Sequence, residues 1–185
     1  MFAARDAALL GLAMAACAAP ASLNVGDVVP DFVLTDVNSA SPTAGVALGP
    51  TSYEGQVAVW YFGHSNCGYC SAQFGELDRI AADLAAAGYD VPVVGVNAAG
   101  LEASNGAITE GRTLPWLQDT EDVDAWGSWG AVWRDAYVLD GDLRVLDKRN
   151  LTAFDLTNDD NAAAYAALLS ELASSAPAAT AKAAR

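Results

Sequence analysis

The sequence predicts an α/β domain with a central mixed β-sheet flanked by helices. Two continuous apolar runs, 57–62 (VAVWYF) and 91–96 (VPVVGV), have the composition of strands that are buried on both faces. Apolar residues at helical spacing fill the segment 67–87 between them. The strand-like pieces 136–139 and 143–146 flank an Asp-Gly turn, which indicates an antiparallel hairpin. Strands that alternate with helices and end in a hairpin indicate a mixed sheet.

The remaining segments complete this pattern in chain order. The ordered domain is expected to begin with the stretch 25–34, and apolar residues alternate at the end of this stretch. The stretch 38–53 carries Ser, Pro, Thr and Gly and is predicted to be a long surface loop. The elements expected after it are a loop with one helical turn at 98–111, an extended piece at 114–117, a helix at 122–130 and an amphipathic helix at 161–172.

The composition excludes several classes of protein. The chain has 185 residues, which is the length of one domain with a tail. Lys and Arg together number 9 against 23 Asp and Glu, and the net charge is -14. So few cations cannot form a basic face for phosphate backbones, so we expect no nucleic-acid partner. No apolar run approaches the roughly 20 residues that span a bilayer. Three cysteines are too few for a disulfide-dense scaffold.

Residues 1–17 have the pattern of an export signal. The apolar stretch 7–16 is followed by small residues. The order Met14-Ala15-Ala16-Cys17 resembles the bacterial lipobox, in which the cysteine becomes the lipidated first residue of the mature protein. Two alternatives stay open. Ala19-Pro20-Ala21 matches an ordinary signal-peptidase site, and the N-terminus could instead be retained.

We therefore expect an exported protein that is periplasmic or in the cell envelope and is anchored to the membrane by a lipid on Cys17. Disulfides persist in such a compartment. A lipid on Cys17 would remove it from redox chemistry. The mature chain is expected to comprise a tether at 18–24, a folded domain at 25–173 and a disordered tail at 174–185.

The candidate reactive groups are the thiols of Cys67 and Cys70, in a Cys-Gly-Tyr-Cys motif. The motif falls where a predicted strand ends and a predicted helix begins. The free N–H groups and the dipole of the first helical turn stabilise a thiolate there. We expect Cys67 to be the exposed nucleophile and Cys70 the buried thiol that resolves a mixed disulfide, with no separate cofactor. The same pair could also form a static structural disulfide.

A zinc site is the other use of a Cys-x-x-Cys motif. His64, Cys67 and Cys70 supply three ligands, whereas a structural zinc site needs four. His64 is the only histidine, and no cysteine remains if Cys17 is lipidated. We therefore expect no metal.

Several stretches together resemble the thioredoxin-like superfamily. They are GDVVPDFVL at 26–34, Tyr53-Glu54-Gly55-Gln56 leading into VAVWYFG, and CGYC with the helix that follows it; Phe62, five residues before the first cysteine, also matches. The chain looks most like the redoxin group of exported TlpA/ResA-type proteins and peroxiredoxins. The resemblance runs from about Val25 to Leu172. It implies a thioredoxin-like fold and thiol–disulfide oxidoreductase activity at Cys67 and Cys70.

The chain departs from that family pattern near the motif. Thioredoxin-like enzymes carry a cis-proline that faces the cysteines, whereas this chain has Arg134 near that position and no proline between Pro115 and Pro177. Asn66 stands where the family has a tryptophan before the first cysteine. Tyr61 stands where thioredoxin has the buried acid that aids proton transfer. The peroxiredoxin motif P-x-x-x-T-x-x-C is absent, since Trp60 and His64 occupy its proline and threonine positions.

Three residues are candidates for tuning the thiols. If Arg134 faces Cys67, its charge would lower the pKa of the thiol, as a comparably placed arginine does in peroxiredoxins; the alternative is a surface ion pair with Asp135 or another acid. His64 is either a polar loop residue or a neighbour that transfers the proton of Cys67. Tyr69 belongs to a Gly-Tyr dipeptide that is similar to that of periplasmic disulfide isomerases.

Four tryptophans cluster in the sequence and admit two interpretations. Such a cluster is either core packing or a surface beside the site that receives an apolar partner segment; its members are Trp116, Trp126, Trp129 and Trp133.

The sequence leaves three functions open. The first is an exported thiol–disulfide oxidoreductase acting on protein thiols or disulfides. The second is a peroxiredoxin-like peroxide reductase that uses the same cysteines. The third is a non-catalytic binding module with a structural disulfide, which the missing cis-proline favours.

Overall fold

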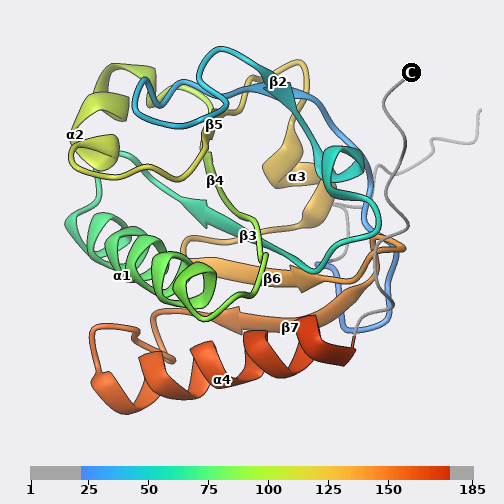
Figure 1. Cartoon of the computed structure of the whole chain (residues 1–185). Helices are drawn as coiled ribbons and strands as arrows, with labels where there is room; N and C mark the ends of the chain where they lie inside the picture. Colours follow the sequence, from blue (N-terminus) through green and yellow to red (C-terminus); the bar gives the residue numbers. More distant parts are fainter. Residues whose placement is uncertain (1–21, 176–185) are drawn as a thin grey trace, which may run out of the picture.

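The computed structural model describes residues 22–175 and contains a five-stranded mixed sheet (Figure 1). The strand order is β5-β4-β3-β6-β7. Strands β3, β4 and β5 are parallel to one another, whereas β6 is antiparallel to both β3 and β7. The predicted mixed sheet is therefore confirmed. The strands are β3 (Ala58–Gly63), β4 (Val93–Asn97), β5 (Trp116–Gln118), β6 (Asp135–Leu139) and β7 (Val145–Asn150).

The helices cover both faces of this sheet (Figure 1). Helices α1 and α4 lie side by side on one face, and α3 lies on the other with the N-terminal segment of the domain. The helices are α1 (Gly68–Ala86), α2 (Asn105–Thr109), α3 (Ala125–Trp129) and α4 (Asp159–Ser175), with short 3-10 turns η1 (Pro50–Tyr53) and η2 (Glu102–Ser104). None of the helices in the described residues combines the length and the apolarity needed to cross a bilayer.

The period of two along each strand divides the core into two parts. In β3, Val59 and Tyr61 pack with α1 and α4, whereas Trp60 and Phe62 pack on the opposite face with α3. All four side chains are fully buried, as expected for a strand without a polar face. A methyl group on Gly95 of β4 would lie 2.2 Å from the ring of Trp116, so glycine is required for this ring to pack across the strand.

The segment 38–53 differs from the predicted surface loop. It contains strand β2 (Ala47–Leu48), which pairs with β1 (Leu34–Thr35), and the turn η1. The buried carboxylate of Asp36 organises this segment, because it accepts hydrogen bonds from Asn38 N and from the hydroxyl of Thr43. Composition predicted a loop because the ordering contacts come from polar groups, which carry no hydrophobic period.

The boundaries of three other segments also differ from the prediction. Helix α3 begins only at Ala125, because Asp124 has a φ of 48° and caps the helix by accepting a hydrogen bond from Gly127 N. The last three residues of the predicted tether pack on the domain, where Leu23 N donates to Trp129 O. Helix α4 extends through Ser175, so the predicted tail begins no earlier than residue 176. Residues 1–21, with the predicted signal and Cys17, lie outside the described residues, as do 176–185.

Candidate functional site

The two thiols of the motif lie where β3 ends and α1 begins. Cys67 is the N-cap residue of α1 and is partly exposed, while Cys70 is buried in the first helical turn. The backbone N–H of Cys70 donates to the Cys67 sulfur at 3.3 Å. The N-cap position, which Ser or Asp usually occupies, is thus filled by a sulfur atom that receives the free N–H groups of the helix.

The two thiols differ in acidity. Burial alone would raise the pKa of Cys67, but the Cys70 thiol, the N–H groups of Cys70 and Tyr69, and the charge of Arg134 lower it below the ordinary value. Deeper burial and the neighbouring Cys67 sulfur raise the pKa of Cys70. These opposite pKa directions favour ionisation at Cys67, and Cys67 is also the thiol that is reachable from solvent. The role of Cys67 as the nucleophile stays a prediction.

Arg134 lies across from the motif, and its Nη1 atom is 3.7 Å from the Cys67 sulfur. It directly precedes β6 and has a φ of 68°, which is uncommon for a residue with a side chain. Two backbone hydrogen bonds hold this conformation, from Arg134 N to Phe62 O and from Leu151 N to Arg134 O, each 2.8 Å long. The structure thus places Arg134 against Cys67, as the first of the two hypotheses for this residue required.

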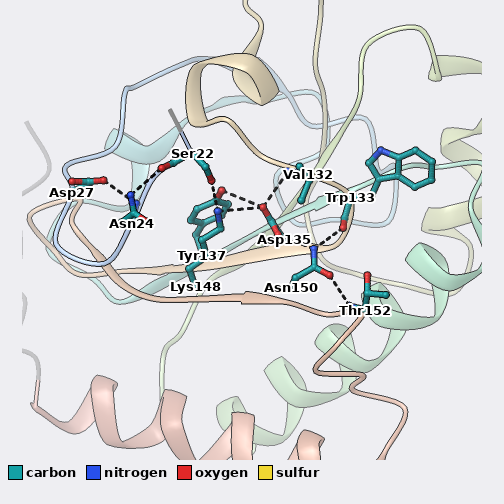
Figure 2. Close-up of polar contacts among 10 residues, drawn as sticks. All are labelled: Ser22, Asn24, Asp27, Val132, Trp133, Asp135, Tyr137, Lys148, Asn150 and Thr152. Carbon is teal, nitrogen blue, oxygen red and sulfur yellow. Dashed lines mark hydrogen bonds and ion pairs between the residues drawn. The ribbon is translucent and has the colours of Figure 1, made fainter. Parts of the chain in front are cut away.

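A polar network that sequence reasoning missed surrounds Asp135, the residue that follows Arg134 (Figure 2). The buried carboxylate of Asp135 accepts hydrogen bonds from Val132 N at 3.1 Å and from the Asn150 amide at 2.8 Å. Asn150 also donates to Trp133 O and accepts from the backbone N–H of Thr152. The hydroxyl of Thr152 accepts a hydrogen bond from Arg134 Nε at 2.8 Å.

The Asp135 carboxylate has two further partners. The Tyr137 hydroxyl donates to it at 3.4 Å, and Lys148 Nζ lies 3.5 Å away (Figure 2). Lys148 also lies 4.8 Å above the Tyr137 ring and hydrogen-bonds to the hydroxyl of Ser22. The alternative ion pair between Arg134 and Asp135 is therefore absent from residues 22–175, because Lys148 and Asn150 occupy that carboxylate.

The His64 ring lies between two tryptophans. Its centroid is 5.1 Å from the Trp126 ring and 4.7 Å from the Trp133 ring. Burial and the charge of Arg134 lower the pKa of His64, so the ring is neutral at pH 7. The contact between His64 and Cys67 is made by the backbone, in which Cys67 N donates to His64 O at 3.1 Å.

The four clustered tryptophans divide into two pairs. Trp116 and Trp129 are fully buried in the two parts of the core. Trp126 is half-buried against His64, and Trp133 is 54% exposed beside the site. Packing therefore accounts for one pair, while the other pair borders the motif.

The other positions named from the sequence lie around the motif. Tyr61 replaces the buried acid and donates its hydroxyl to the Cys70 carbonyl at 3.1 Å. Burial raises the pKa of Tyr61, so this group stays protonated. Asn66 is exposed, and Tyr69 is 75% exposed at the start of α1.

A groove of about 480 Å³ opens beside Cys67, between the start of α1 and the η2–α2 segment. The loop that carries its wall is fixed by Ser65, whose N–H donates to the Asn97 side chain at 3.0 Å and whose hydroxyl donates to Leu101 O. Small residues line the groove and leave its backbone accessible; they are Ser65, Asn66, Cys67, Gly68, Ser71, Ala103, Ser104, Gly106 and Ala107.

No metal site is assembled around the motif. Among residues 22–175, no three His, Cys, Asp or Glu side chains lie together as ligands for an ion. His64 packs between tryptophans rather than joining the two sulfurs in a ligand set.

The AhpC/TSA family model matches residues 25–148, more than half of the chain. The chain belongs to the AhpC/TSA family. No curated protein matches the sequence at a significant level.

Three solved structures show where the AhpC/TSA fold of this chain recurs. The thioredoxin domain of a thiol-disulfide oxidoreductase from Bacteroides vulgatus is 17% identical, with 80% of this chain and 99% of that chain covered and a TM-score of 0.62. A thiol:disulfide interchange protein from Bacteroides sp. is 18% identical, with 84% and 94% covered and a TM-score of 0.60. Peroxidoxin BcpB from Mycobacterium tuberculosis is 19% identical, with 79% and 98% covered and a TM-score of 0.59. At these identities the likeness establishes the thioredoxin-like fold, as predicted.

Within the AhpC/TSA fold, the two substituted motif positions have distinct surroundings. Trp60 is fully buried among Phe32, Tyr53 and Trp129 on the face away from α1. It is therefore a core residue of β3. His64 lies beside the motif but turns its ring to the tryptophans, so neither residue presents a hydroxyl or a proline ring to Cys67.

Proposed function

We propose that this protein is a thiol–disulfide oxidoreductase in which Cys67 is the nucleophile and Cys70 the resolving thiol. The observation that carries the proposal is the asymmetry of the pair. The Cys67 sulfur is reachable and receives a helix N–H and the Arg134 guanidinium, whereas Cys70 lies buried three residues behind it. A purely structural disulfide needs neither the charge nor the access.

In the proposed reaction, the Cys67 thiolate attacks one sulfur of a substrate disulfide. A bond forms between Cys67 and that sulfur, and the substrate's other sulfur leaves as a thiolate. Cys70 then loses its proton and attacks the Cys67 sulfur, which releases the second substrate thiol and leaves a Cys67–Cys70 disulfide. The reverse sequence oxidises a substrate dithiol. The groove beside Cys67 offers room for a substrate segment, and we propose protein thiols or disulfides as the substrates.

The reduction potential of the Cys67–Cys70 pair tests this proposal. It is measured on the full chain by equilibration with glutathione or thioredoxin buffers. A value between about -120 and -270 mV falls among working oxidoreductases and supports the proposal, and its place in that range gives the direction of electron flow. A value below about -300 mV identifies a structural disulfide and favours the non-catalytic binding module.

A peroxide reductase is the second candidate, and the contact between Arg134 and Cys67 favours it. The positive charge would stabilise the thiolate that attacks a peroxide oxygen, and Cys70 would then form a disulfide with the resulting sulfenic acid and release water. Consumption of hydrogen peroxide by the reduced protein separates the two. A rate no greater than that of Cys67→Ser excludes the second candidate.

We also propose that the protein is exported and carries a lipid on Cys17, on the strength of the apolar stretch 7–16 and the lipobox-like order that ends at Cys17. Radiolabelled palmitate added to bacteria that express the full chain tests this. Incorporation that Cys17→Ala abolishes supports the anchor. Export without label supports cleavage at Ala21 instead.

A further inference from the structure

The positive charge of Arg134 is not neutralised by any acidic side chain of residues 22–175. The ion pairs in that part of the chain involve Arg79, Lys148 and Arg149. Arg134 donates from Nε to the Thr152 hydroxyl and from Nη1 toward the Cys67 sulfur. No acceptor within the described residues takes the N–H groups of its Nη2 atom. The guanidinium therefore keeps donors available at the reacting sulfur.

Asp135, the acid that follows Arg134 in sequence, interacts with other residues. Asp135 is the first residue of β6, and its carboxylate contacts Tyr137, two residues along the same strand, and Lys148 of β7 (Figure 2). The same network fixes the Arg134 segment, because Asn150 joins the Asp135 carboxylate to the Thr152 backbone. The arrangement holds a cation in place without neutralising it, in a protein whose net charge is -14.

The partner of this cation changes with the redox state of Cys67. As a thiolate, Cys67 is a counter-ion 3.7 Å from Nη1. In a disulfide the sulfur is neutral, and the guanidinium then has no counter-ion among residues 22–175. A carboxylate is the group that best matches the planar donors of a guanidinium. His64, neutral at pH 7, offers no competing charge beside it.

Resting on the proposed oxidoreductase function, we propose that Arg134 selects substrates whose reacting sulfur lies next to a carboxylate. The carboxylate replaces the Cys67 thiolate at the guanidinium when Cys67 enters a disulfide. When Cys67 attacks such a disulfide, the Cys67–substrate bond forms, the substrate's S–S bond breaks and a carboxylate-bearing thiolate leaves. The thiolate charge of Cys67 is lost when the disulfide forms. The carboxylate of the substrate half that stays bonded to Cys67 then takes its place beside the guanidinium.

Three small disulfides that differ only in their end group test this selection. They are dithiodipropionate, bis(2-hydroxyethyl) disulfide and cystamine, whose ends are anionic, neutral and cationic. The rate of oxidation of the reduced full chain is followed for each, in the parent protein and in Arg134→Gln, Arg134→Lys and Arg144→Gln. Arg144→Gln is the matched control, because Arg144 is exposed at the far end of the β6–β7 hairpin and the net charge changes equally.

The ratio of the anionic to the cationic rate is the decisive quantity. A change in the nucleophilicity of Cys67 affects all three disulfides alike and cancels in this ratio. We expect the ratio to fall by about two- to fivefold in Arg134→Gln, the range expected for a partly exposed ion pair, and to be retained in Arg134→Lys and Arg144→Gln. Rising salt should lower the ratio in the parent protein, which checks the inference without a substitution.

Two outcomes overturn the inference while sparing the proposed function. They are an equal loss of rate for all three disulfides in Arg134→Gln, and a salt-independent ratio in the parent protein. Failure of the parent protein to react with any disulfide instead overturns the oxidoreductase proposal and this inference with it.

Peptides that carry Glu or Lys beside a disulfide-bonded Cys identify the source of the carboxylate. A preference for Glu assigns the carboxylate to a peptide, and a preference confined to the small disulfides assigns it to an acidic thiol.

Discussion

Cys67 is contacted from two sides by segments that differ in their distance along the chain. On the near side, Cys70 lies in the same helical turn and donates its backbone N–H to the sulfur. On the far side, Arg134 is separated from Cys67 by 67 positions, and its side chain donates to Thr152 while Asn150 donates to the adjacent Trp133 carbonyl. The contact on the near side forms wherever a helix starts at a cysteine. The contact on the far side forms only when the sheet is assembled.

This difference separates two requirements of the site. Local backbone geometry supplies the helix N–H to the sulfur and needs no other part of the protein. The fixed positive charge needs the β6–β7 pairing, in which Asp135 lies opposite Asn150. Substitutions on the near side should therefore change the chemistry itself, while substitutions on the far side should change its rate, its pH dependence or the stability of the domain.

The largest effect is expected from the two cysteines. Cys67→Ser should abolish the reaction with bis(2-hydroxyethyl) disulfide, because Cys70 is buried and burial raises the pKa of its thiol. Cys70→Ser should permit the first step only, so mass spectrometry should detect the mixed disulfide on Cys67. Reaction of Cys67→Ser at the parent rate would show that Cys70 is the nucleophile.

Removing the charge of Asp135 should have the next largest effect, and it should appear in stability. Asp135→Asn leaves Lys148 and Tyr137 without their buried partner and should lower the free energy of unfolding by about 1–3 kcal/mol. Urea denaturation followed by tryptophan fluorescence measures this change. Asp147→Asn is the control, since its ion pair with Arg149 is partly exposed and is worth less than about 1 kcal/mol. Equal losses in the two variants would contradict a special role for the Asp135 network.

The sequence predicts the local, near-side features of this protein better than the far-side features, which depend on distant parts of the chain. The central strands, α1 and the order of the two thiols were predictable because hydrophobic period and helix start are local signals. Arg134 could be located only through its offset from the family pattern, and the structure confirms that it faces Cys67. Asn150 and Thr152 carried no signal, because their roles depend on a register that includes an irregularity between Val138 and Leu139.

The ordered segment 38–53 was missed for a related reason. Its contacts run to Arg112 and Leu114, whose carbonyls accept hydrogen bonds from the Asn38 side chain at 3.0 and 2.8 Å. These partners are far apart in the sequence, and polar contacts of this kind leave no periodic pattern. Long-range polar networks are thus the part of both the fold and the site that sequence reasoning did not reach.

Removing the far-side charge should shift the pH dependence of the near-side thiol. The pKa of Cys67 lies below its ordinary value, and thiolate is the reactive form, so the alkylation rate with iodoacetamide should reach half of its maximum at a lower pH than for a free cysteine. In Arg134→Gln the midpoint should move to higher pH, because the charge that favours thiolate is gone. The rate at pH 7 should fall as well. An unmoved midpoint would show that helix N–H groups alone set the acidity.

The smallest effect is expected from a single hydroxyl on the far side, that of Thr152. Thr152→Val removes the acceptor of Arg134 Nε but keeps the shape of the side chain and the charge of the guanidinium. The alkylation midpoint should therefore move in the same direction as in Arg134→Gln, by a smaller amount, because a guanidinium that is no longer held spends part of its time away from the sulfur. Thr152 is exposed, so the free energy of unfolding should change by less than about 1 kcal/mol. Thr35→Val, at an exposed position in β1, is the matched control and should leave the midpoint where it is. If Thr152→Val also leaves it there, the backbone hydrogen bonds to Phe62 and Leu151 suffice to place Arg134, and the network serves stability alone.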